Sequence, residues 1–297
     1  MRYALLVVLG SALWATDAIF RHPLVQQISP FTIVFFEHIF ATAISFIVLM
    51  MSKERRSFFI GSKEFFVSAF VGIFGSAVAT VLFTMSFQLI NPSVAILLQK
   101  IQPIFVILFS YLFLGETLSL IFFFWATIAL VSAFFLSFPL RINFSDFKSS
   151  TAMGCSFSIL AAFLWAASTT AGKFALQKTP AIVLSFWRFA FGLMALYALS
   201  RRFDVMQVEI PFVPGQPGVL RSLFIMALIP GFLGVSLYYA GLKKISASTA
   251  TILELSFPVS AVAMNFYFLN IHLTAIQYSA ASALILAMVG VSQTIKR

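Results

Sequence analysis

The sequence predicts an all-α integral membrane protein with ten transmembrane helices, arranged as two inverted five-helix repeats. Composition is the first observation behind this prediction. Of the 297 residues, 61% are hydrophobic and only 9% are charged, and the mean hydropathy is +1.02. Soluble domains carry roughly 25% charged and about 45–50% apolar residues. The composition therefore excludes a soluble domain and a disordered chain, and the single cysteine, Cys155, excludes an intrachain disulfide.

Ten apolar segments are the second observation. A helix that crosses a bilayer needs about 20 apolar residues, and windows of this kind occur ten times. The expected spans are residues 3–20, 30–51, 65–87, 92–114, 118–138, 151–172, 181–200, 221–241, 247–269 and 274–294. The apolar stretch 92–138 is too long for one span, so a tight turn at Gly115-Glu116-Thr117 is expected to divide it.

Similarity between the two halves of the chain is the third observation. The matched elements, separated by 150 to 155 residues, are Leu13-Trp14-Ala15 with Leu164-Trp165-Ala166, Pro30 with Pro180, 93–98 with 248–253, and Pro103 with Pro258. The expected repeats are residues 1–140 and 150–297. Each repeat holds five spans, an odd number, so the second repeat enters the membrane from the opposite side. Inverted repeats are typical of secondary transporters; a duplication that only stabilises a helix bundle is the alternative.

The distribution of Lys and Arg predicts the orientation. With the N-terminus inside, eleven basic residues lie on the inner side and six, Arg21 among them, on the outer side. Cytoplasmic loops carry an excess of basic residues, so we expect both termini in the cytoplasm and a location in the cytoplasmic (inner or plasma) membrane. The net charge of +10 then indicates topology and contact with anionic lipid rather than nucleic acid.

The chain resembles the ten-helix EamA-like branch of the drug/metabolite transporter superfamily. The resemblance rests on Leu13-Trp14-Ala15, on the stretch 93–103 and on Leu114-Gly115-Glu116-Thr117. The second half departs from the family pattern at Leu269-Asn270-Ile271, where Leu-Gly-Glu is frequent. The resemblance implies a carrier of amino acids or other small metabolites, often an exporter, that hydrolyses no ATP. It also implies a central cavity lined by the first, third, fourth, sixth, eighth and ninth spans.

Ionisable residues inside the expected spans need a partner or a water-filled cavity. They are Asp17, Glu37, His38, Lys100, Arg188 and Glu254. Counting residues from the span ends places the first four at one level in the outer third of the membrane. There we expect Glu37 or Asp17 to lie with Lys100, while the spacing of Asp17 and Arg21 favours an i,i+4 pair. Glu37 and His38 are the candidates for proton coupling.

The same count places Arg188 and Glu254 in the inner third, where we expect them to form an ion pair. Such a pair would either face the substrate or only hold helices in register. Lys100 lies beside Gln99 and Gln102 on the fourth span, and its ammonium group would suit a carboxylate or phosphate. Lys100, Gln99, Gln102 and Glu254 are therefore the expected polar groups of a substrate site.

Two matched pairs of residues complete the candidate site. Trp14 and Trp165 occupy equivalent positions in the repeats and are expected either to stack against a flat substrate or to pack against helices and lipid. Pro103 and Pro258 lie near the middle of their spans, where proline frees a backbone carbonyl. We expect both to kink helices that line the cavity, inert kinks being the alternative.

The sequence thus predicts a secondary transporter that moves a small metabolite, such as an amino acid, by alternating access, with export the expected direction. A carrier of nucleotide sugars or sugar phosphates and a non-transporting membrane protein are the alternatives. No enzyme motif, cofactor site or metal-ligand spacing is present in the sequence. The expected partners are the substrate, the lipid bilayer and protons, with a homodimer left open.

Overall fold

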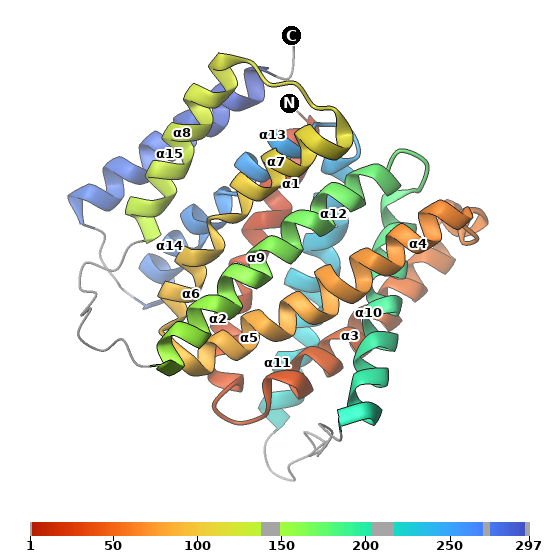
Figure 1. Cartoon of the computed structure of the whole chain (residues 1–297). Coiled ribbons are helices and arrows are strands. Elements are labelled where there is room, and N and C mark those ends of the chain that lie inside the picture. Colours follow the sequence, from red (N-terminus) through yellow and green to blue (C-terminus); the bar gives the residue numbers. More distant parts are fainter. Residues whose placement is uncertain (1, 138–148, 204–216, 270–273, 295–297) are drawn as a thin grey trace.

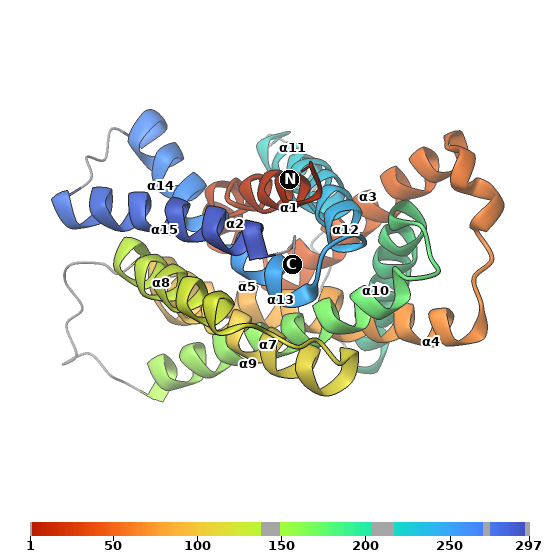
Figure 2. The same ribbon diagram turned by 90° about the horizontal axis from the view of Figure 1, so that it is seen from above.

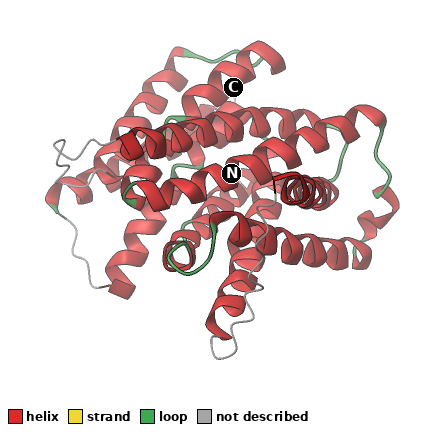
Figure 3. Ribbon diagram, turned by 60° about the horizontal axis from the view of Figure 1, so that its bottom comes forward, coloured by secondary structure: helices red, strands yellow, loops and turns green. Residues whose placement is uncertain are grey.

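A computed structural model describes residues 2–137, 149–203, 217–269 and 274–294, and in these ranges the all-helical membrane fold is confirmed (Figure 1). Short loops join the helices (Figure 3). Ten helical spans are long and apolar enough to cross a membrane. They are Arg2–Leu24, Pro30–Met51, Ser62–Leu89, Pro92–Leu114, Leu120–Ser137, Thr151–Ala175, Ala181–Arg201, Gly218–Leu242, Ala247–Met264 and Ala275–Thr294. The expected linker between the repeats, with Arg141 and Lys148, and the terminal Lys296 and Arg297 lie outside the described residues.

Half of the spans are continuous helices and half are interrupted. The continuous ones are α3 (Pro30–Met51), α8 (Leu120–Ser137), α9 (Ser149–Ala175), α10 (Ala181–Phe203) and α15 (Ala275–Thr294). The interrupted ones are α1 (Arg2–Trp14) with α2 (Asp17–Leu24), α4 (Ser62–Phe70) with η2 (Val71–Val78) and α5 (Ala79–Leu89), α6 (Pro92–Gln99) with α7 (Gln102–Leu114), α11 (Pro217–Met226) with η4 (Ala227–Gly234) and α12 (Val235–Leu242), and α13 (Ala247–Leu253) with α14 (Ser256–Leu269). A short 3₁₀ helix, η1 (Lys53–Ser57), follows α3.

Proline explains the interruptions of the fourth and ninth spans. Pro103 is the second residue of α7 and Pro258 the third residue of α14. A proline cannot bond to the carbonyl four residues earlier, and its ring clashes with that carbonyl. The carbonyls concerned belong to Gln99 and Glu254, and the helices stop there or one residue earlier. The expected kinks are therefore complete breaks, which place Lys100 and Glu254 at the first position after α6 and α13.

Local sequence also fixes where the spans begin and end. Asn91 caps α6 because its side-chain oxygen accepts the backbone N–H of Ser93 at 2.8 Å, and Ser246 caps α13 by accepting from Thr249 at 3.1 Å. Gly115 ends α7 in the left-handed conformation with φ of 66°, where a glycine is favoured. The predicted division of 92–138 by a tight turn is confirmed.

The third and eighth spans each contain a π-helical segment, η2 and η4, at positions separated by 156 residues. π-Helical segments are rare in proteins overall, and those that do occur often lie at functional sites. Glycines in and beside them permit close packing: a Cβ added at Gly72 would lie 2.6 Å from the carbonyl oxygen of Arg188, and one at Gly10 would lie 2.7 Å from that of Gly234. Small residues at helix contacts are the usual means of close approach in membranes.

Two of the spans stand apart from the rest. Helices α8 and α15 pack along each other at one edge of the bundle, as Figures 1 and 2 both show. Gly290 of α15 lies directly against the indole ring of Trp125 of α8. Many of their remaining apolar side chains are exposed, as expected for surfaces that face lipid. The other eight spans are left to surround the interior.

A carboxylate ties the two halves of the chain together. The two Glu116 carboxylate oxygens accept the backbone N–H groups of Ala247 and Ser248, at 2.7 and 3.0 Å. These two groups open α13, where a helix has no internal acceptors for its N–H groups and a negative charge is favoured. Nearby, the Lys173 ammonium donates to the carbonyl oxygens of Leu242 and Ile245, at 2.9 and 2.6 Å. The two Glu116 bonds therefore hold the turn between α7 and α8 against the start of α13 in the second half.

Replacing Glu116 by Ala should lower stability, because two backbone donors lose a charged acceptor. The expected cost is about 1–3 kcal/mol, seen as a lower unfolding temperature of the detergent-solubilised protein. Glu54→Ala is the matched control, since Glu54 is exposed in η1, and it should leave the unfolding temperature unchanged. Equal unfolding temperatures for Glu116→Ala and wild type would show that this contact does not stabilise the fold.

Candidate functional site

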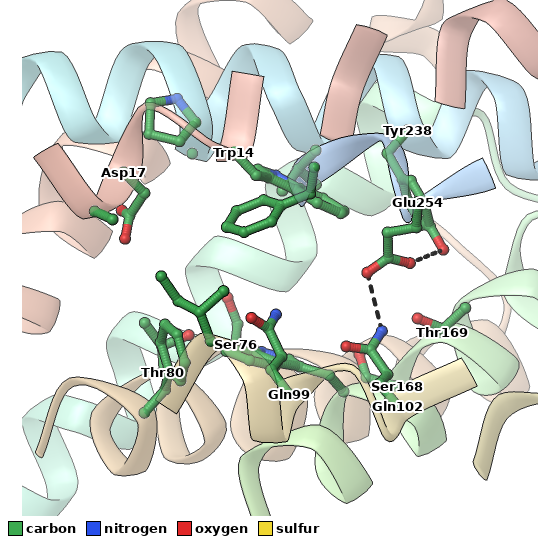
Figure 4. Close-up of a pocket in the computed structure, with 18 of the residues that line it drawn as sticks. Trp14, Asp17, Ser76, Thr80, Gln99, Gln102, Ser168, Thr169, Tyr238 and Glu254 are labelled. Carbon is green, nitrogen blue, oxygen red and sulfur yellow. Dashed lines mark hydrogen bonds between the residues drawn. The ribbon is translucent and has the colours of Figure 1, made fainter. Parts of the chain in front are cut away.

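A cavity of about 160 Å³ opens among the spans. One water molecule needs about 10–15 Å³ by the same measure, so the cavity has room for a small organic molecule. Figure 4 shows Trp14, Tyr238 and Glu254 on one side of it and Ser76 and Gln99 on the other. The lining includes Trp14, Asp17, Arg21, Glu37, His38, Ser76, Thr80, Phe83, Phe87, Gln99, Lys100, Gln102, Pro103, Trp165, Ser168, Thr169, Arg188, Tyr238, Tyr239, Thr251, Glu254 and Phe257.

All but one of the predicted site residues line this cavity. The eleven that do are Trp14, Asp17, Glu37, His38, Gln99, Lys100, Gln102, Pro103, Trp165, Arg188 and Glu254. Pro258 does not, although the break that it causes places Glu254 there. The second and seventh spans also contribute, through Glu37 and Arg188 among others, so the set of six lining spans that the resemblance implied is too small.

Arg21 forms the centre of a buried ion-pair network. Its guanidinium bonds to both carboxylate oxygens of Asp17, at 2.5 and 2.8 Å, and to Glu37 at 2.9 Å. A further N–H donates to the hydroxyl of Thr84 at 2.8 Å. The expected i,i+4 pair of Asp17 and Arg21 is therefore present. Counting Arg21 in an outer loop was wrong: α2 continues past it to Leu24, and two carboxylates neutralise a side chain that is only 2% exposed.

Lys100 does not join that network. The ion pairs among the described residues are those of Arg21 with Asp17 and Glu37, so the expected contact of Lys100 with either carboxylate is absent. Arg21 already occupies both carboxylates. The Lys100 ammonium lies 4.0 Å from the centre of the Phe257 ring, in a cation–π contact, at the edge of the cavity. Its charge remains free of any carboxylate within the described part of the chain.

Arg188 does not pair with Glu254 either, which corrects the second expected ion pair. Its guanidinium donates instead to the hydroxyls of Tyr239 and Ser76, at 2.9 and 3.2 Å, and to the carbonyl of Gly75 at 3.2 Å. Counting residues along a helix gives the depth of a side chain but not the direction in which it points. The π-helical segment η2 brings the Gly75 carbonyl to Arg188, and three neutral acceptors take the place of one carboxylate.

The neighbours of His38 favour one tautomer of its neutral ring. Its Nδ1 lies 2.8 Å from the carbonyl oxygen of Val34, which can only accept, so Nδ1 carries the hydrogen. In the neutral ring Nε2 is then an acceptor, and the Ser76 hydroxyl donates to it over 3.0 Å. The same hydroxyl oxygen accepts from Arg188. A continuous chain of hydrogen bonds therefore runs from Arg188 through Ser76 to His38.

Within the described residues, the Glu254 side chain is bonded only to neutral groups. One carboxylate oxygen accepts from the Gln102 amide at 3.1 Å and the other accepts from the Tyr238 hydroxyl at 3.1 Å (Figure 4). The Tyr238 ring also packs against Trp14, with ring centres 4.9 Å apart. The two broken helices are thus connected across the cavity, Gln102 at the start of α7 with Glu254 at the end of α13.

Several cavity groups have no hydrogen-bond partner among the described residues. They are the side-chain oxygens of Gln99, Ser168 and Thr251. A buried polar atom without a partner costs about 1–3 kcal/mol, so a ligand that supplied donors or acceptors here would recover that energy. Arg21, Ser76 and Tyr238 were not among the predicted site residues. The i,i+4 partner of Asp17 was the available signal for Arg21, while hydropathy alone treats Tyr238 as one more apolar residue.

Comparison with known proteins agrees with this architecture. The sequence model of the EamA-like transporter family matches residues 1–138 and 152–293 of this chain. The chain belongs to the EamA-like transporter family. It is therefore a member of the drug/metabolite transporter superfamily, as the motifs of the sequence predicted, and a multi-pass membrane protein of a family of small-molecule transporters.

One relative of this EamA-like chain is the riboflavin transporter ImpX of Fusobacterium nucleatum subsp. nucleatum, to which it is 27% identical over 302 residues. The aligned region covers 98% of this chain and 97% of the relative. It is 24% identical over 242 residues to an uncharacterized transporter of Archaeoglobus fulgidus, covering 79% and 78% of the two chains. A solved crystal structure superposes with a TM-score of 0.75 at 17% identity, covering 99% of both chains. That last likeness concerns the fold alone.

The ion-pair network predicts the outcome of a neutralisation series. Arg21→Met leaves the buried Glu37 and the half-buried Asp17 carboxylates without a cation and should cost roughly 3–5 kcal/mol of stability. The triple variant Asp17→Asn/Arg21→Met/Glu37→Gln removes all three charges and should recover most of it. The measurement is the unfolding temperature in detergent, with the exposed Arg55→Met as the control. A triple variant no more stable than Arg21→Met would contradict this account of the network.

Proposed function

We propose that this protein is a secondary transporter for a neutral, flat heteroaromatic metabolite of the riboflavin type, working by alternating access in the cytoplasmic membrane. The observation that carries the proposal is the combination of aromatic faces and uncommitted polar atoms in one cavity. Trp14, Trp165, Phe83 and Tyr238 supply the faces, and Gln99 supplies an amide oxygen without a partner. Riboflavin itself is the first candidate because a relative that matches almost the whole chain carries that name.

The charges of the lining support a substrate without net charge. Three cationic side chains and three carboxylates face the cavity, so the fully ionised lining is balanced. The cations are Arg21, Lys100 and Arg188, and the carboxylates are Asp17, Glu37 and Glu254. A nucleotide sugar or sugar phosphate would need an excess of cations to replace its hydration. The balance therefore favours a neutral or zwitterionic substrate over the phosphorylated one that was the alternative.

An amino acid is the second candidate, and a specific feature favours it. Lys100 and Glu254 carry opposite charges, face the same cavity and form no ion pair with each other. A zwitterion could place its carboxylate at Lys100 and its ammonium group at Glu254. Riboflavin-type and amino-acid substrates differ in size and in charged groups, so a single transport assay separates the two candidates.

Alternating access needs two halves that can move relative to each other, and we propose the inverted repeats 1–140 and 150–297 for this role. Matched irregularities support the assignment. The π-helical segments η2 and η4 lie at equivalent positions, and so do the breaks after α6 and α13. The family model also matches in two segments, one in each half. Broken helices at the centre of inverted repeats are typical of carriers that expose one site to each side in turn.

The orientation remains the one that the basic residues favour, with both termini in the cytoplasm. The burial of Arg21 strengthens this preference, because it removes one basic residue from the outer side. Cysteines introduced at Lys178 and at Ser29, in loops expected on opposite sides, would test it with an impermeant thiol reagent on intact cells. Both variants are made in a Cys155→Ser background, because Cys155 is a free thiol near the start of the sixth span, and labelling of Ser29→Cys alone is expected.

The transport proposal is tested by counterflow in proteoliposomes. Vesicles loaded with unlabelled riboflavin should accumulate labelled riboflavin from outside, and protein-free vesicles should not. Amino acids and a nucleotide sugar are offered in parallel. Net uptake and net efflux, measured separately, test the expected direction of export. Counterflow of amino acids alone would select the second candidate, while counterflow of the nucleotide sugar alone would contradict both.

Trp165→Ala should weaken the affinity for riboflavin, because a stacking face is lost. Stacking of a flat ring on an aromatic side chain contributes about 1–3 kcal/mol, which corresponds to about a 5-fold to 150-fold rise in half-saturation. Phe66→Ala is the control, since this ring lies on α4 and is 71% exposed on the surface of the bundle. Equal half-saturation in Trp165→Ala and wild type would remove the stacking role.

A further inference from the structure

We propose that Glu254 is the site at which a proton binds and is released in each transport cycle, coupling substrate flux to the pH gradient. This inference rests on the proposed transport function and moves the coupling site away from Glu37 and His38, the candidates that the sequence suggested. The argument is geometrical: it depends on which cavity carboxylates are committed to cations and which are not.

The other acidic groups of the cavity are committed. Asp17 and Glu37 both bond to the Arg21 guanidinium, so a proton arriving at either would have to displace a charge-assisted hydrogen bond. His38 is committed as well. Its Nδ1 donates to Val34, its Nε2 accepts from a hydroxyl that Arg188 already bonds, and a second proton would bring a positive charge towards that guanidinium.

Glu254 differs because both of its partners are neutral. When a proton adds to the oxygen beside Tyr238, an O–H bond forms and the carboxylate becomes a neutral acid. That O–H can donate to the Tyr238 oxygen, and the Tyr238 hydroxyl can then turn away from the carboxylate towards the cavity, which Thr169 also lines. The Gln102 amide continues to donate to the other oxygen. Both protonation states are therefore accommodated by the rotation of one hydroxyl, and the proton leaves by the reverse steps.

The charged groups that face Glu254 leave it without a fixed counter-ion. The cations whose charges act on it are Lys100, from the break after α6, and Arg188, from α10, and neither forms an ion pair with it. Tyr238 and Tyr239 are the titratable groups of α12. The remaining helices packed against α13 and α14 are α1, α7, α8, α9 and α15. Of these, α7, α8 and α15 carry no Asp, Glu, Lys, Arg or His, α1 carries only Arg2, and Lys173 of α9 is bonded to carbonyls. The tyrosines of these helices, Tyr3, Tyr111 and Tyr278, are exposed on the surface of the bundle.

Contacts around Glu254 connect the proton to the substrate. Tyr238, which bonds Glu254, also packs against Trp14, one of the proposed stacking faces. Gln102, the other partner, lies three residues from Gln99, whose amide oxygen is free for a ligand. A change in the charge of Glu254 therefore acts on both the aromatic and the amide parts of the proposed substrate site.

The experiment compares two modes of transport in the same proteoliposomes. Counterflow needs no gradient and reports binding and reorientation, whereas accumulation driven by an imposed pH gradient reports coupling. Wild type should show both with riboflavin. Glu254→Gln, which mimics the protonated acid, should lose accumulation driven by the gradient by a far larger factor than any fall in its counterflow. Glu254→Asp keeps a titratable group and should retain gradient-driven accumulation. Glu54→Gln, at an exposed position, should behave as wild type.

Each outcome bears on the inference. Wild type with counterflow but no response to the pH gradient would overturn the coupling while leaving the transport function in place. Gradient-driven accumulation that survives in Glu254→Gln and disappears in His38→Gln would move the coupling site to His38 and overturn the assignment. Absence of counterflow for every solute would instead contradict the transport proposal. In that case the infrared band of a protonated carboxyl group, present in wild type and lost in both Glu254→Gln and Glu254→Ala, supports the proton site independently, and its persistence overturns it.

Discussion

The hydrocarbon interior of a bilayer cannot hydrogen-bond to the chain, and this constraint governs the whole arrangement. Backbone groups that a helix leaves unpaired must be satisfied by protein or by a cavity. The protein breaks its helices at Lys100 and at Glu254, and both breaks lie on the cavity rather than on the lipid face. The continuous helices α8 and α15 occupy the edge of the bundle, where no such shelter exists (Figure 1). Fold and site therefore follow from one requirement.

The same constraint explains how charges are distributed inside the membrane. Arg21 is buried with two carboxylates and a hydroxyl around it, so its cost is offset locally. The Arg188 guanidinium is instead hydrogen-bonded to neutral acceptors, one of which is the carbonyl of Gly75 in the π-helical segment η2. These two guanidiniums are fixed parts of the wall. Lys100 and Glu254 face the cavity without an ion pair among the described residues, so they are the charges that the proposed substrate or proton would meet.

The sequence predicted the membrane spans and most of the residues that line the cavity, but it did not predict most of the contacts between those residues. Apolar length and turn residues determine a transmembrane helix locally, so ten spans and the turn at Gly115 could be predicted. Prolines at matched positions also indicated where helices depart from regular geometry. The pairing of Arg188 with Glu254 failed because depth along a helix says nothing of rotation about its axis. The commitment of Glu37 to Arg21 depended on α2 continuing past Thr16, a local irregularity that hydropathy does not record.

The asymmetry between the halves bears most directly on the proposed function. Lys100 and Glu254 each directly follow a helix and lie three or four residues before a proline, yet one is a cation and the other a carboxylate. In the proposed transport function, the unlike charges of the two breaks would hold a substrate in one orientation in the cavity between them. Only one of the two charges, the carboxylate, is bonded to groups that can either donate or accept. In the proposed mechanism, Glu254 responds to protons, and Lys100 supplies a cation that faces the substrate from the other broken helix.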